Sequence, residues 1–67
     1  MNNLYVSEQI IELELELLKK QRIPSIVFMN KATFDTLIRE LEKDKFFNVI
    51  HGMKIEIVST KGALVVV

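Results

Sequence analysis

The stretch IPSIVFMNKATFDTLIREL, residues 23–41, predicts a buried strand, a helix cap and an amphipathic helix in immediate succession. The apolar run at residues 25–29 is short and contains β-branched side chains, which favours a strand over a helix. Pro24 has no backbone N–H and therefore fits just before the strand. Asn30 can cap the following helix by accepting a hydrogen bond from its first turn. We expect the rest of the chain to pack around this unit.

The helix predicted after Asn30 carries a single apolar stripe. Its members recur at intervals of three and four residues, which places them on one side of a helix: Phe34, Leu37, Ile38 and Leu41. On the exposed side, Asp35 and Arg39 stand four residues apart and are expected to attract each other by roughly a few tenths of a kcal/mol. Glu40 and Asp44 have the same spacing and are expected to repel by a similar amount.

Residues 10–18, IIELELELL, support two interpretations. Glutamate and leucine alternate, and a period of two is typical of a strand. Leu, Glu and Lys are strong helix formers, however, and Ser7 could cap a helix whose basic end, residues 19–22, suits the helix dipole. We therefore predict a helix. Its apolar residues cover an arc of about 200°, at about 100° per residue, and Glu14 lies inside that arc.

The broad apolar arc of this helix is more than one small domain can cover. A chain of 67 residues buries only about 60% of its unfolded surface, and 49% of these residues are hydrophobic. One interpretation places the leucines in the core of the domain, and the other places part of the arc against a partner chain. The two interpretations are compatible. Glu14 is expected to pair with a basic group across an interface. The predicted interface joins this helix to the last strand and comprises Ile10, Leu13, Glu14, Leu17, Leu18, Val65 and Val67.

The second half of the chain predicts two strands. Residues 46–50 are expected to fold back under the end of the second helix, and His51-Gly52 marks a turn. Residues 53–58 alternate between apolar and charged side chains, as in a half-buried strand. Residues 59–62 predict a hairpin turn, and residues 63–67 a strand that is apolar on both faces.

These elements predict one α+β domain over residues 1–67. Their order is helix, strand, helix, strand, strand, and the simplest packing is a three-stranded mixed sheet with both helices on one face. The last two strands are expected to form a hairpin. Residues 1–6 are expected to be a loose arm or a small edge strand.

Composition argues against several classes of function. The chain has nine Lys and Arg, nine Asp and Glu, one His, two Gly and no Cys. Proteins that bind nucleic acid without sequence preference carry an excess of positive charge, and the formal charge of this chain is zero. A structural zinc site needs several His or Cys ligands, and the chain has one His and no Cys. Two scattered glycines form no phosphate-binding loop. We expect no catalytic activity, no cofactor and no small-molecule substrate.

The apolar runs and the first residues of the sequence predict the cellular compartment of the protein. No run approaches the roughly 20 residues of a membrane span. The first residues, MNNLYVSEQ, lack the basic-then-apolar layout of a signal peptide. We therefore expect a cytoplasmic protein that does not contact membranes.

One family shares the order of these features: a helix, Pro24, an apolar strand ending in Met-Asn, a helix with Phe34 and Leu37, and a Gly-x-Lys-Ile strand from Gly52. Over about residues 10–67 this layout resembles a segment of the axial domain of tailed-bacteriophage major capsid proteins. The resemblance implies a phage-borne or prophage-borne piece of that fold that self-associates and has no catalytic site.

The sequence thus favours a small protein–protein interaction module that forms a homo-oligomer or binds a protein partner. The alternative is a dimeric nucleic-acid-associated regulator. A dimer could gather several basic side chains into one face despite zero net charge, namely Lys19, Lys20, Arg22 and Lys31.

Overall fold

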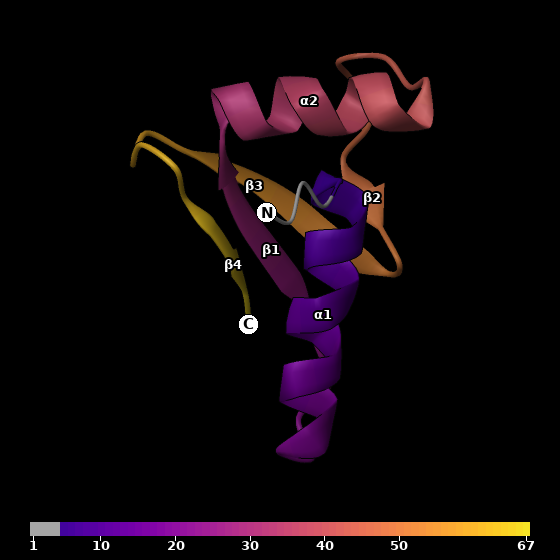
Figure 1. Cartoon of the computed structure of the whole chain (residues 1–67), viewed down its shortest axis with the longest axis vertical. Coiled ribbons are helices and arrows are strands. Elements are labelled where there is room, and N and C mark those ends of the chain that lie inside the picture. Colours follow the sequence, from indigo (N-terminus) through magenta and orange to yellow (C-terminus); the bar gives the residue numbers. More distant parts are fainter. Residues whose placement is uncertain (1–4) are drawn as a thin grey trace.

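The computed structural model describes residues 5–67, which form two helices and a four-stranded mixed sheet (Figure 1). In chain order the elements are α1 (Val6–Lys19), β1 (Ile26–Asn30), α2 (Lys31–Leu41), β2 (Val49–Ile50), β3 (Met53–Val58) and β4 (Leu64–Val66). The predicted α+β class is confirmed, but the sheet has four strands rather than three. The predicted N-terminal arm falls mainly on residues 1–4, which lie outside the described residues, and Val6 already belongs to α1.

The strands lie in the order β2-β3-β1-β4. β1 and β3 are parallel and are connected through α2, whereas β4 runs antiparallel to β1 and β2 runs antiparallel to β3. The predicted hairpin between the last two strands is therefore wrong. β3 has β1 on one side and β2 on the other, so β4 pairs with the free edge of β1 instead. Val27 at the centre lies opposite both Ile55 and Val66.

The hydrophobic core lies between one face of the sheet, here called the inner face, and the two helices. Alternate strand residues point into it, and they are Val27, Met29, Ile50, Met53, Ile55 and Val66. The helices contribute Val6, Ile10, Phe34 and Leu37. Ile38 and Leu41 pack against this cluster, which confirms the apolar stripe of α2. The prediction that both helices cover one face is also confirmed, and α1 crosses in front of the strands in Figure 1.

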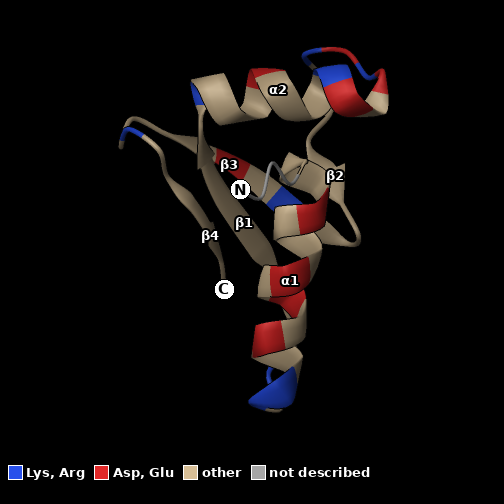
Figure 2. Cartoon of the chain, viewed as in Figure 1, with Lys and Arg blue, Asp and Glu red and all other residues tan. Residues whose placement is uncertain are grey.

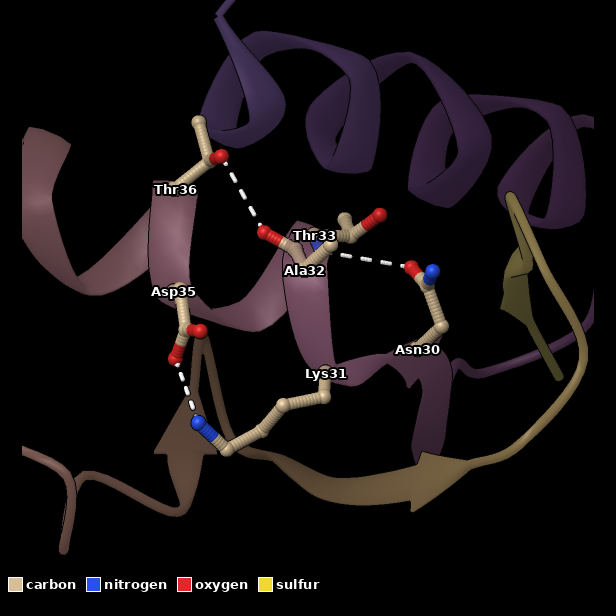
Figure 3. Close-up of polar contacts among 6 residues, drawn as sticks. All are labelled: Asn30, Lys31, Ala32, Thr33, Asp35 and Thr36. Carbon is tan, nitrogen blue, oxygen red and sulfur yellow. Dashed lines mark hydrogen bonds and ion pairs between the residues drawn. The ribbon is translucent and has the colours of Figure 1, made fainter.

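The start of α2 forms as predicted. The Asn30 side-chain oxygen accepts a hydrogen bond from Thr33 N at 3.2 Å, and Thr36 Oγ1 donates to the Ala32 carbonyl (Figure 3). Asp35 does not pair with Arg39. Its carboxylate binds Lys31 Nζ at 2.8 Å, one turn earlier in the helix.

Residues 10–18 are helical, which settles the choice between helix and strand. The helix begins one residue before Ser7, and its cap differs from the prediction. Glu40 of α2 accepts hydrogen bonds from Val6 N at 2.7 Å and from Ser7 N at 3.1 Å. A carboxylate at the positive end of a helix binds free N–H groups more strongly than a neutral hydroxyl does. Glu40 therefore joins α2 to the start of α1.

Each helix is followed by a residue other than glycine in the left-handed backbone conformation. Gln21 has φ of 61° and Glu42 has φ of 56°. The next N–H reaches back to an earlier carbonyl in each case, from Arg22 to Leu17 at 3.0 Å and from Lys43 to Ile38 at 2.8 Å. This is the Schellman arrangement, which normally places glycine at that position.

A tight turn accounts for the unpredicted strand β2. His51 and Gly52 both have positive φ, as a two-residue type I′ hairpin loop requires, and they place Ile50 opposite Met53. The turn predicted at these residues is confirmed. The fold-back predicted for residues 46–50 is more ordered than expected, because Val49 and Ile50 pair with β3 while Phe47 packs against the core.

Candidate interaction surfaces

The second face of the sheet, here called the outer face, carries none of the core residues. Side chains alternate along a strand, so the neighbours of the core residues in sequence point to this face. Most are apolar: Ile26, Phe28, Val49, Val58, Val65 and Val67, with Lys54 and Glu56 among them. Val65 and Val67 are each 49% exposed, whereas Val66 between them is 7% exposed. A sheet face that is left to solvent usually carries polar side chains instead.

The register arranges the outer face into two short rows. Lys54, Ile26 and Val67 lie side by side in the first, because Lys54 is opposite Ile26 and Ile26 exchanges two backbone hydrogen bonds with Val67. The second row holds the residues two positions away along each strand, which are Glu56, Phe28 and Val65. Between the rows, Ile55, Val27 and Val66 point inward.

The two charged residues of the outer face lie on the same strand. Lys54 Nζ and Glu56 Oε2 are 2.9 Å apart, and both side chains are exposed. Because the pair is exposed, its attraction contributes little to the stability of the single chain. The outer face is therefore apolar over β1 and β4, and its charged side chains lie on β3, where Val58 follows them.

Helix α1 presents two apolar sides. Ile10 is fully buried, and Leu13 and Leu17 pack against the core. The predicted interface needs correction at Ile10, which has no surface left for a partner chain, whereas Leu13 and Leu17 are only partly buried. A second stripe points to solvent: Ile11 is 44% exposed, Leu15 51% and Leu18 52%. Of the predicted helix residues, Leu18 alone belongs to it.

Glu14 pairs with a basic group, but within its own chain. Its Oε1 atom lies 2.7 Å from His51 Nδ1, in the turn between β2 and β3. The expected pairing across an interface is therefore not needed to explain Glu14. His51 has a defined role that its sequence context did not reveal, because it connects this turn to the middle of α1.

The charges of α1 are separated along its length. Figure 2 shows acidic positions along the helix and a basic segment at its end. Lys19 Nζ lies 3.6 Å from Glu16, and Lys31 is bound to Asp35. Two of the four side chains of the predicted basic face therefore already have acidic partners within the chain.

The described part of the chain offers few features of other kinds. Residues 5–67 contain no pocket and no group of three or more His, Cys, Asp or Glu side chains placed to hold a metal ion. Neither α1 nor α2 has the length and apolar character needed to cross a membrane. The exposed apolar stripe of α1 and the outer face of the sheet are therefore the features that need an explanation.

Comparison with known proteins assigns no role to these two surfaces, so their role is inferred from their own chemistry. The resemblance to capsid axial domains stays a prediction. The chain matches no protein-family model, no curated protein and no solved structure.

Proposed function

We propose that this chain is a protein–protein interaction module that self-associates by packing the outer face of its sheet against the outer face of a second copy. The observation that carries the proposal is the apolar character of that face, on which Phe28 lies at the centre between Glu56 and Val65. Packing two sheets face to face about 10 Å apart would bury these side chains in a second core.

The register makes the outer face complementary to itself. A two-fold axis across the strands, along the line Ile55–Val27–Val66, would exchange the two rows between the copies. Phe28 of one copy would then lie over Ile26 of the other, and Val65 over Val67. The same rotation would place Lys54 opposite Glu56, so the charges attract rather than repel. A second copy therefore fits both the apolar and the charged parts of the face.

Association would also supplement a small core. The buried hydrophobic residues of the single chain form one cluster on the inner face, and domains of this size are often stabilised by oligomerisation. Each exposed valine that becomes buried would contribute roughly 1 kcal/mol, at about 25 cal/mol per Å² of apolar surface.

Sedimentation equilibrium over a range of concentrations tests the proposal. The wild-type chain, of 7.8 kDa, is expected to reach at least twice that mass. Val65→Lys should weaken the association at least about tenfold, because it buries an unpaired charge. Ile23→Lys is the matched control, since Ile23 is 87% exposed and belongs to neither row. Equal association of both variants would contradict the proposal.

The charged pair allows a sharper test by exchange between copies. Lys54→Glu and Glu56→Lys should each weaken self-association, because each places like charges opposite one another. An equimolar mixture of the two variants should associate again, since the glutamate introduced in one chain would face the lysine introduced in the other. Loss of the contact within one chain cannot be rescued in this way. A mixture that associates no better than either variant alone would reject the proposed pairing.

A further inference from the structure

We infer that the exposed stripe of α1 is a second self-association surface, on which α1 of another copy packs in the antiparallel direction. Ile11, Leu15 and Leu18 form this stripe, with the spacing i, i+4, i+7 of a helix–helix contact. The inference goes beyond the proposed function and depends on different residues. If the outer face does not self-associate, the inference about α1 still holds.

The charges beside the stripe identify the occupant. At about 100° per residue, Glu8, Glu12 and Lys19 all fall on the same flank of the stripe. A two-fold axis perpendicular to two antiparallel helices keeps equivalent flanks together and reverses their order. The acidic first half of α1 would therefore face Lys19 of the copy. In a parallel pair the two-fold axis would run along the helices and place each flank against the opposite flank of the copy, so Lys19 would meet neither Glu8 nor Glu12.

The contacts that this flank makes within the chain are exposed. Glu8 Oε1 accepts a hydrogen bond from Tyr5 N at 3.1 Å, which leaves the charge of Glu8 at the surface. Lys19 is paired with Glu16 at 3.6 Å, and both side chains are more than 60% exposed. Exposed pairs of this kind are weak and exchange partners readily. On the other flank, Glu14 is held by His51, which keeps its charge away from the contact. A second copy is thus favoured over a foreign helix, which would have to supply the same charge order by itself.

The two surfaces can be occupied together. The core side of α1 packs on the inner face of the sheet, so its exposed stripe and the outer face belong to different surfaces of the chain. Each surface would be joined by its own two-fold axis. Two-fold axes that intersect at a right angle would close a tetramer, those that intersect at certain smaller angles would close a larger assembly, and those that do not intersect would give an open chain of dimers. The wild-type protein should therefore assemble beyond a dimer.

Sedimentation equilibrium distinguishes the contributions of the two surfaces when four proteins are compared: wild type, Leu15→Lys, Val65→Lys and the double variant. Wild type should exceed twice the 7.8 kDa chain mass, each single variant should stop at a dimer, and the double variant should be monomeric. A wild-type dimer that only Val65→Lys dissociates would overturn this inference and keep the proposed function. A wild-type dimer that only Leu15→Lys dissociates would keep the inference and overturn the proposed function. Circular dichroism checks that every variant is folded.

Cysteine cross-linking tests the direction of packing, since the chain has no cysteine of its own. Leu15 lies near the middle of the stripe, so Leu15→Cys should form disulfide-linked dimers by itself. Ile11→Cys and Leu18→Cys should link poorly alone and efficiently when mixed with each other. Ile23→Cys is the control for random collision. Efficient linking of Ile11→Cys to itself would show parallel helices and overturn the antiparallel arrangement.

Discussion

The two faces of the sheet are built from the same strands and have similar side chains, yet only one of them is covered. On β4, Val66 points to the inner face and is buried, while Val65 and the residue that follows the strand, Val67, point to the outer face and are half exposed. On β1, Val27 and Met29 are fully buried, while Phe28 between them belongs to the outer face. The hydrophobicity of a strand therefore does not reveal which of its faces the chain itself can cover.

The difference follows from the number of helices. Two short helices can cover one face of a four-stranded sheet, and both pack on the same face here. A strand that is apolar on both faces is usually covered on both. Substitutions on the inner face should therefore destabilise the chain at every protein concentration, whereas substitutions on the outer face should act mainly through association.

The largest effect is expected at Met29, at the centre of the inner face. Met29→Ala should lower the free energy of unfolding by about 3 kcal/mol, because it removes buried atoms and leaves a cavity. Urea denaturation followed by circular dichroism measures this loss. It should be the same at low and high protein concentration, and Ile23→Ala, at an exposed site, should change stability little. A loss below about 1 kcal/mol would mean that Met29 is not part of a tightly packed core.

Adjacent valines on β4 compare the two faces directly. Val66→Ala should lower the free energy of unfolding by about 2 kcal/mol at all concentrations. Val65→Ala should lower it by less than about 0.5 kcal/mol in the monomer, and by more as the protein associates. Thermal denaturation at several concentrations measures both. If Val65→Ala proved as costly as Val66→Ala in the monomer, the distinction between the faces would be wrong.

A smaller effect is expected where the two covering helices meet. Glu40→Gln should destabilise the chain by about 1 kcal/mol, because it removes the negative charge that binds Val6 N and Ser7 N. Glu16→Gln on the exposed side of α1 is the matched control, because the exposed pair of Glu16 with Lys19 contributes little to stability. Amide hydrogen exchange should also become faster at the start of α1. Unchanged exchange there would argue against the contact.

The smallest effect is a gain in stability at the end of α2. Glu42→Gly should stabilise the chain by about 0.5 kcal/mol, because glycine adopts the left-handed backbone of this position without strain. Glu42→Ala keeps the side-chain carbon responsible for the strain and should give no such gain. Thermal denaturation of the two variants compares them, and equal stability would show that the backbone there is not strained.

Local signals in the sequence were sufficient for the central unit. The apolar run, the cap at Asn30 and the 3.6-residue period of α2 all act within a few residues, and all three appear in the structure. The ends of the helices were not predictable in the same way. Gln21 and Glu42 occupy positions where glycine is the usual signal, and Glu40 caps a helix that is distant from it in sequence.

The order of the strands and the exposed surfaces depended on long-range contacts. Residues 59–62 have the composition of a hairpin turn, but the neighbour of β4 is decided by the edge of β1 that remains free. The apolar arc of α1 was predicted, yet which part of it faces the core is fixed by the direction from which the sheet packs. Leu18, Val65 and Val67 are exposed as an interface would require, whereas Ile10 is not.

Nuclear Overhauser contacts between differently labelled copies test the central claim most directly. A mixture of isotope-labelled and unlabelled wild-type chains would be observed at a concentration where the protein associates. Packing of the outer faces predicts intermolecular contacts from the Phe28 ring to the Ile26 methyl groups, because the proposed two-fold axis places these residues opposite each other. An associated sample whose intermolecular contacts involve α1 alone, with none at Phe28, would contradict the account.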